Sequence, residues 1–502
     1  MKQLSGLDAT FLHMETPSQF GHVSSLSIYE RPSADYDPLS AWRQQIERRL
    51  HLLEPLRRRL VEVPLGLDHP YWIEDPDFDL DFHVRHTAVP PPGDDAQLAE
   101  LVARIIGRPL DRSRPLWETY VIEGLADDRF GVLTKIHHAT IDGASGAELT
   151  VIMLDSTPDG DDVPPPERPW EPDAIPSDME VMARAGANLI RKPGRALLLS
   201  ARALREFGEQ TRNPALIMAA RQWRNSLRGP LGRILNAGRR RDEERDPPPT
   251  LPVGGAPRTR FNRGITPHRK FAFRATSLSQ VKDIKNALGA TVNDVVMAAC
   301  AGALRTYLEK RGELPNEPLV SMIPVSIRTG EETERWTNRV SGLIALLPTN
   351  EADPLQRVRK VHEAMVSSKE LFNAIPAETL TDFAQFPSPA LFTRAVRMAT
   401  RWGVMARLAP TAGNLTISNV PGPREPLYAA GAKLLHYFPV STIVDGQGLN
   451  ITVQSYMDSL DWGLVACREL VPDVSDLMDD IANELDVLAE AAGVSADAGA
   501  RA

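Results

Sequence analysis

Two adjacent histidines, His137 and His138, lie in the segment Gly131-Val-Leu-Thr-Lys-Ile-His-His-Ala-Thr-Ile-Asp-Gly143. An imidazole titrates near neutral pH, so it can remove a proton from a hydroxyl group and later return it to a leaving group. Neighbouring side chains on a strand face opposite ways, so both rings cannot point into one site without distortion. The pattern therefore predicts that only one of the two histidines is the base.

A metal site and ordinary packing are the alternatives for this pair. Two metal ligands on one helix need a spacing of three or four residues, whereas these histidines are adjacent, so we expect no metal. The two cysteines, Cys300 and Cys467, also lack the paired spacing of a zinc site. One core and one surface histidine before a glycine turn remains the packing alternative, but two His, an Asp and a Gly in one short segment favour chemistry.

The sequence around the pair predicts the elements that hold it. Residues 130–136 are typical of a strand, and Asp142 and Gly143 are typical of a turn that leads into a helix through Leu149. Upstream, apolar residues recur on one face of a predicted helix over residues 95–106. The first half of the chain is therefore expected to be mixed α/β.

The same mixture recurs later in the chain. A long helix should begin near Thr291, because its hydroxyl can cap the helix while Asp294 reaches back to the capping residue. An apolar stripe from Val474 to Leu488 predicts a final helix. After the second linker we also expect strands that alternate with helices, at residues 271–273, 319–324, 343–347, 449–454 and 462–466.

The length of 502 residues exceeds what one hydrophobic core usually organises, and two proline-rich charged stretches, 159–176 and 242–258, are typical of linkers. We expect an N-terminal domain over 1–160 that carries the histidine pair and a C-terminal domain over 263–490. A proline-rich and basic helical connector should fill 161–262, with a frayed tail at 491–502.

The histidine segment matches the His-His-x-x-x-Asp-Gly signature of the CoA-dependent acyltransferase superfamily. Five other segments narrow the resemblance to the bacterial wax ester synthase/diacylglycerol acyltransferase family, and together they cover nearly the whole chain. This resemblance implies two chloramphenicol-acetyltransferase-like domains with the active site in a tunnel at their interface. The five segments are Leu4-Ser-Gly-Leu-Asp-Ala-Thr-Phe-Leu12, Pro115-Leu-Trp-Glu118, Thr291-Val-Asn-Asp-Val295, Asn338-Arg-Val-Ser341 and Ser418-Asn-Val-Pro-Gly422.

The resemblance also implies roles for the residues of the signature. His138 would be the general base, acting without an acyl-enzyme, and His137 would support it. Asp142 would point away from the imidazole and pair with an arginine that holds the loop; we expect Arg328 to be that partner, and a surface arginine is the alternative. Gly143 would allow a tight turn beside the substrate channel.

Two further motifs match those of the family. Asn293 and Asp294 fill its Asn-Asp motif and could orient the acceptor or stabilise an oxyanion, but Asp is also simply favourable in the first turn of a helix. Pro115, Leu116 and Trp117 fill its Pro-Leu-Trp motif, for which we expect packing near the acyl or CoA channel.

The function implied by the resemblance is transfer of a long-chain acyl group from acyl-CoA to diacylglycerol, giving triacylglycerol, and possible transfer to fatty alcohols. Acyl-CoA is then a substrate, and no further cofactor is expected. Another hydroxylated lipid as acceptor and a carrier-protein thioester as donor are the alternatives within enzymes. A non-catalytic lipid- or acyl-CoA-binding paralogue is the alternative outside them.

Charge and hydropathy bear on partners and location. The net charge of −9 argues against nucleic acid, and no run approaches eighteen uncharged apolar residues, so we expect a cytoplasmic protein. Residues 184–241 nevertheless carry fourteen Lys or Arg and only two acidic residues. This segment would suit peripheral attachment to the inner face of an anionic membrane or to lipid droplets. A solvated connector and a surface for the CoA phosphates are the alternatives.

Overall fold

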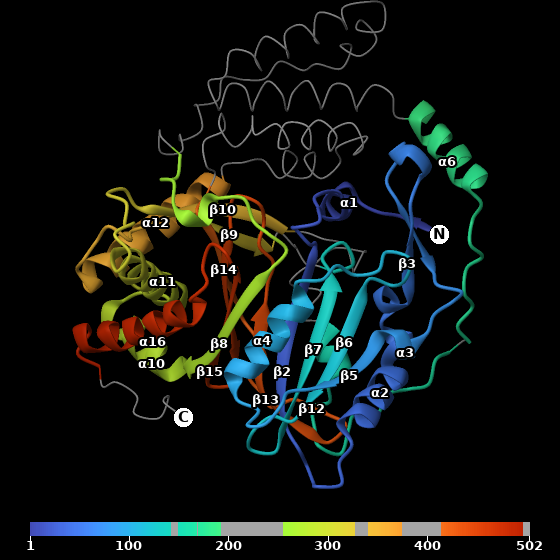
Figure 1. Ribbon diagram of the computed structural model, residues 1–502, viewed down its shortest axis with the longest axis horizontal. Helices are drawn as coiled ribbons and strands as arrows, with labels where there is room; N and C mark the ends of the chain where they lie inside the picture. The colour runs from blue at the N-terminus through green and yellow to red at the C-terminus, as the bar shows by residue number, and fades with distance from the viewer. Residues whose placement is uncertain (142–148, 168, 192–254, 327–339, 374–412, 495–502) are drawn as a thin grey trace, which may run out of the picture.

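The computed structural model describes the 502-residue chain except for residues 142–148, 168, 192–254, 327–339, 374–412 and 495–502. Asp142, Gly143 and Arg328, together with most of the basic segment, lie outside the described residues. The described part contains two six-stranded sheets and one sheet of three short strands (Figure 1). The three-stranded sheet has the order β1-β4-β3, with β1 (Lys2–Gln3), β4 (Tyr71–Glu74) and β3 (Arg58–Val61).

The first six-stranded sheet carries the histidine pair. Its order is β12-β13-β2-β7-β6-β5, and all pairs are antiparallel except β5 with β6. Helix α4 (Asp95–Ile106) packs on one face, and α2 (Pro38–Arg49) packs on the other. The strands are β2 (His22–Glu30), β5 (Val84–Ala88), β6 (Trp117–Glu123), β7 (Arg129–His137), β12 (Tyr428–Ala429) and β13 (Ala432–Val440).

The second six-stranded sheet has the order β10-β9-β11-β14-β15-β8, in which β11 runs parallel to both of its neighbours. A layer of helices packs against this sheet (Figure 1). The strands are β8 (Arg269–Ser277), β9 (Leu319–Ser326), β10 (Val340–Leu347), β11 (Leu415–Val420), β14 (Leu449–Tyr456) and β15 (Ser459–Cys467). The helices are α10 (Leu278–Leu288), α11 (Val292–Glu309), α12 (Pro354–Asn373) and α16 (Val474–Ala491).

Local sequence signals account for several of these elements. The Thr291 hydroxyl accepts the Asp294 amide and the Asp294 carboxylate accepts the Thr291 amide, so the predicted capping box at the start of α11 is confirmed. A second capping box, made by Asp94 and Gln97, starts α4 where the periodicity predicts a helix. The strands predicted after residue 263 and the final helix are also confirmed.

The two sheets are joined through strand exchange and a shared core. Strand β13 comes late in the chain but pairs with β2 of the first sheet, and it also contacts β15 of the second. At that contact a Cβ on Gly463 would lie 1.7 Å from the Pro439 carbonyl oxygen, and beside it Phe273 of β8 and Phe438 of β13 have ring centroids 4.7 Å apart. The boundaries predicted for the domains stay predictions, because sheet pairing does not assign the connector.

The remaining described elements are short or peripheral. None of the described helices is by itself long and apolar enough to cross a membrane; α10 and α11 pass that test only together, bent by 101°. Within the described ranges, no group of three His, Cys, Asp or Glu residues could hold a metal ion. The remaining described helices are α1 (Gly6–His13), α3 (Leu80–His83), α6 (Asp178–Arg191) and the 3₁₀ turns Leu50–Leu52, Glu54–Arg57, Pro64–Gly66 and Arg260–Asn262.

Candidate active site

The two histidines lie where β7 ends and a turn begins. His137 is the last residue of the strand and is 1% exposed, whereas His138 lies in the turn and is half-buried. The Nδ1 atom of His137 accepts the Ala139 amide at 3.0 Å, so the ring proton must be on Nε2. That nitrogen lies 3.3 Å from Oε1 of Glu15, an electrostatic contact without the alignment of a good hydrogen bond.

His138 is held by its backbone and by one aromatic ring. Its amide donates to the Gly21 carbonyl at 2.8 Å, just before β2 begins. Its imidazole stacks on Phe11 of α1, with ring centroids 4.1 Å apart and planes 10° from parallel. The two histidines therefore have different surroundings, with His137 fixed in the interior and His138 placed beside an aromatic face.

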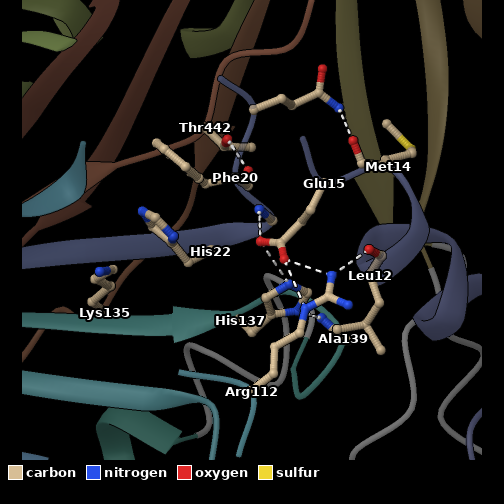
Figure 2. A network of polar contacts seen from close by, with 12 residues as sticks. Leu12, Met14, Glu15, Phe20, His22, Arg112, Lys135, His137, Ala139 and Thr442 are labelled. Carbon is tan, nitrogen blue, oxygen red and sulfur yellow. Dashed lines mark hydrogen bonds and ion pairs between the residues drawn. The ribbon is translucent and has the colours of Figure 1, made fainter. Parts of the chain in front are cut away.

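Glu15 joins the elements around the histidine turn (Figure 2). Its Oε1 accepts the Gly21 amide at 2.7 Å, and its Oε2 accepts Nη2 of Arg112 at 2.7 Å. Burial alone would raise the pKa of this carboxyl, but His137, the Gly21 amide and Arg112 together lower the pKa of Glu15 to about 2. Glu15 is therefore a carboxylate at neutral pH, and it supplies a fixed negative charge next to His137.

Gly21 lies where only a glycine fits. A Cβ at this position would stand 2.5 Å from Nε2 of His137 and 3.1 Å from the Phe11 carbonyl oxygen. The missing side chain lets Gly21 donate to Glu15 and accept from His138 at the same time. The close approach of this backbone to the histidines depends on the absence of a side chain.

Two buried bases lie near His137. His22 is its partner across β2 and β7, and its Nε2 contacts the Ile106 carbonyl oxygen at 2.9 Å. Burial, followed by the charge of Lys135, holds the pKa of His22 well below its ordinary value. Burial also lowers the pKa of Lys135 to about 8, and its Nζ donates to the Arg108 carbonyl at 2.7 Å. Nε2 of His22 and Nζ of Lys135 are therefore both engaged by backbone carbonyl oxygens.

The Asn-Asp motif lies in the first turn of α11. Asp294 is 2% exposed. Its Oδ2 accepts a hydrogen bond from the Thr291 amide and lies 2.9 Å from Nδ1 of His362. These contacts give Asp294 a structural role as a helix cap. Asn293 is half-buried beside it. A role for either residue toward substrate stays a prediction.

The Pro-Leu-Trp motif is buried at the start of β6. Leu116 is fully buried, and its carbonyl accepts the amide of His137 at 2.9 Å. Trp117 stacks on His83 with centroids 4.4 Å apart, and its Nε1 donates to the Leu56 carbonyl at 2.8 Å. Pro115 is also buried. All three residues of the motif are buried, and their expected packing near an acyl or CoA channel stays a prediction.

Four residues around the turn were not identified from sequence: Phe11, Glu15, Gly21 and Arg112. Phe11 falls inside the family-like segment that ends at Leu12, so that segment held a usable signal. Arg112 lies 97 residues from Glu15, and a single charged residue in a loop carries no sign of such a partner. The described structure brings these four together with His137 and His138, whereas Asp142, Gly143 and Arg328 lie outside it.

Comparisons with known proteins show the family of the chain. A family model for the wax ester synthase/diacylglycerol acyltransferase catalytic domain matches residues 4–296, and the model for the C-terminal domain of the same family matches residues 336–489. Two Mycobacterium tuberculosis H37Rv proteins that are named as diacylglycerol O-acyltransferases are similar to the chain. Rv3087 is 34% identical over 95% of each chain, and Rv0221 is 35% identical over 99% of this chain and 98% of its own.

Solved structures give the same result at the level of the fold. The chain is similar to the wax ester synthase/diacylglycerol acyltransferase from Marinobacter aquaeolei VT8, with 28% identity and a TM-score of 0.69 over 98% of this chain and 100% of that one. A condensation domain of the calcium-dependent antibiotic synthetase shares the fold, with 17% identity and a TM-score of 0.53 over 99% and 98% of the two chains. The predicted mixed α/β fold with two chloramphenicol-acetyltransferase-like domains is confirmed. The chain belongs to the wax ester synthase/diacylglycerol acyltransferase family and is an acyltransferase.

Proposed function

We propose that this acyltransferase moves a long-chain acyl group from acyl-CoA to the free hydroxyl of diacylglycerol, forming triacylglycerol, and that it also accepts fatty alcohols. The observation that carries the proposal is the unequal environment of the two histidines at the end of β7. It supports a single base in the expected place, on a chain whose relatives are named for this activity.

His138 is the general base in this proposal. Its imidazole removes the proton of the acceptor hydroxyl as the oxygen attacks the thioester carbonyl carbon. The tetrahedral intermediate then collapses, the carbon–sulfur bond breaks, and the imidazolium returns its proton to the CoA thiolate. The ester and free CoA are the products, and no covalent acyl-enzyme forms. Stacking on Phe11 limits the orientations that this ring can adopt.

His137 is a supporting residue in this proposal. Its Nδ1 lone pair is occupied by the Ala139 amide, and its Nε2 proton faces Glu15, so the ring offers no free basic nitrogen. By holding the Ala139 amide, His137 fixes the backbone that directly follows the base. Asp142 paired with Arg328, and Gly143 in the turn, would complete the support of this loop.

The activity is tested by measuring release of free CoA from palmitoyl-CoA, first with diacylglycerol and then with hexadecanol, with the lipid products identified in parallel. General-base catalysis contributes about 10² to 10⁴ in rate, so His138→Ala should lower kcat by about that factor. His137→Ala should lower kcat less, because it loosens the turn and leaves the base. His86→Gln is the matched control, because His86 is 48% exposed on the edge strand β5 and should keep wild-type activity.

The result with wild-type protein separates the remaining functions. Triacylglycerol or wax ester that disappears chiefly with His138→Ala supports the proposal and its base. If the protein binds palmitoyl-CoA but acylates neither acceptor, the proposal fails in favour of another acceptor or a binding role. Equal activity of wild type and His138→Ala would remove His138 as the base.

A further inference from the structure

The short segment 15–21 connects the histidine turn to the second sheet. It turns back on itself between Thr16 and Gln19, whose backbones bond to each other at 2.9 and 3.2 Å. At one end, Glu15 lies against His137 (Figure 2), and Gly21 binds both the Glu15 carboxylate and the His138 amide. We call residues 15–21 the brace.

The other end of the brace is bound by residues of the second half of the chain. The Phe20 carbonyl accepts the Thr442 hydroxyl at 2.9 Å, and Oε1 of Gln19 accepts the Asp445 amide at 2.8 Å. Thr442 and Asp445 belong to the connection between β13 and β14. Three consecutive residues of the brace are therefore held by the second half, because the Ser18 carbonyl also accepts from Arg269.

Arg269 is an unusual group to find at this contact. It is 7% exposed, and its Nη2 donates to the Ser18 carbonyl at 2.7 Å while its guanidinium lies 5.2 Å from the centre of the Phe20 ring. Burial lowers the pKa of Arg269 to about 10. A buried cation bonded to carbonyl oxygens is costly unless the geometry is kept, so it favours one fixed position of the brace.

The path from the second half to the base is short. Thr442 binds the carbonyl of Phe20, the next residue is Gly21, and the Gly21 carbonyl binds the amide of His138. Glu15 fixes Gly21 from the side through its amide, and Arg112 fixes Glu15. A shift of the second half at Thr442 would therefore displace the backbone that holds the base.

We propose that the brace sets the position of His138 relative to the second half of the protein, with Glu15 and Thr442 as positioning residues at its two ends. The inference rests on the proposed function of His138 as general base. Glu15 and Thr442 touch no reacting atom in this proposal; they act through Gly21 and the backbone of His138.

The test compares the two ends of the brace singly and together. Thr442→Val removes one hydroxyl donor at nearly constant volume and should lower kcat about fivefold, the effect of one hydrogen bond. Glu15→Leu leaves the Gly21 amide without its acceptor and should lower kcat by about 10²-fold, the scale of a misplacement of about 1 Å. KM for both substrates should stay within about twofold of wild type, since substrate contacts are kept.

The double variant is the decisive measurement. Because both residues act through one brace, Glu15→Leu with Thr442→Val should lose about as much kcat as Glu15→Leu alone. Glu15→Gln keeps an acceptor for the Gly21 amide, so its kcat should be at least about tenfold higher than that of Glu15→Leu. Thr87→Val on the edge strand β5 is the matched control and should leave kcat unchanged. Multiplicative losses in the double variant, or losses confined to KM, would overturn the inference.

A second readout needs no acyl transfer. Carbethoxylation of His138 by diethyl pyrocarbonate is followed by peptide mass spectrometry in each folded variant. Release of the ring from its fixed position should change this rate at least about threefold in Glu15→Leu and in Thr442→Val, but not in Thr87→Val. An unchanged rate of His138 carbethoxylation in both variants would overturn the inference about the brace, even if the wild type acylates no acceptor. Inactive wild type with altered labelling would reject the proposed function and keep the brace.

Discussion

Charged groups near the two six-stranded sheets include some that are partnered in different ways. Beside the first sheet, the half-buried Glu15 accepts the Gly21 amide next to the histidine turn, and the buried Lys135 donates to the Arg108 carbonyl. Beside the second, Arg357 of α12 forms a buried ion pair with Glu484 of α16, inside the helix layer. The first arrangement fixes loop backbone, whereas the second joins two helices to each other.

This difference indicates a division of labour between two regions of similar architecture. A charge bound to loop backbone transmits its position to the residues that follow, which suits a site that needs an exact geometry. A side-chain pair between helices has no such consequence for a distant turn, so its loss should appear in stability. We therefore expect variants of the first region to act chiefly on kcat and variants of the second to act chiefly on the free energy of unfolding.

The largest expected effect is on the ion pair of the helix layer. Arg357→Met leaves Glu484 buried without its cation and should lower the free energy of unfolding by about 3–5 kcal/mol. Urea denaturation measures this loss, and kcat of the folded fraction should stay at the wild-type value. Arg274→Met, which removes the exposed pair with Asp479, is the control and should cost at most about 1 kcal/mol. A large loss of kcat in Arg357→Met would break the comparison.

The next effect is at the glycine beside the histidines. Gly21→Ala places a methyl group 2.5 Å from Nε2 of His137, so the turn must shift, and kcat should fall by about 10²-fold. Gly131→Ala is the matched control in β7, where the new Cβ would meet its neighbours at an ordinary 3.6 Å. Steady-state release of CoA measures both variants. Wild-type kcat in Gly21→Ala would show that the turn tolerates displacement.

The smallest effect is a pH dependence that comes from Glu15. The folded pKa of about 2 lies below the ordinary 4.5, so its stabilising contribution is present above pH 4.5 and is lost as pH falls toward 2. The advantage of wild type over Glu15→Gln in free energy of unfolding should be on the order of 1 kcal/mol larger at pH 6 than at pH 3.5. Urea denaturation at both pH values tests this.

The control for this measurement is Glu62→Gln, which removes a 62% exposed carboxylate that contacts the same Arg112. It should change the free energy of unfolding by at most about 0.5 kcal/mol. An advantage of wild type over Glu15→Gln that is the same at both pH values would show that the Glu15 carboxylate does not stabilise the turn.

The predictions from sequence succeeded where the cause of a structure is local. The capping box at Thr291 and the helix over residues 95–106 follow from residues within a few positions of each other. The separation of His137 from His138 was expected from the alternation of side chains along a strand, and the structure gives the two rings different environments. Family resemblance then supplied the expected roles, which periodicity alone could not.

The parts that could not be predicted depend on contacts between distant residues. Nothing near Glu15 in sequence indicates that it meets His137 and Arg112, 122 and 97 residues away in the order of the chain. The pairing of β13 with β2 joins segments about 400 residues apart, and no residue of β13 indicates which strand it pairs with. Such contacts arise only when the whole chain packs.

The late position of β13 has a consequence for synthesis of the protein. A chain leaving the ribosome carries β2 and β7 long before residues 432–440 exist, so the outer edge of β2 stays open until those residues are made. An open strand edge is a template for pairing with other chains, and closure between distant segments is slow. The brace also lacks its Thr442 contact until that residue emerges. The protein therefore completes the sheet that carries the histidine pair only after residues 432–440 have been made.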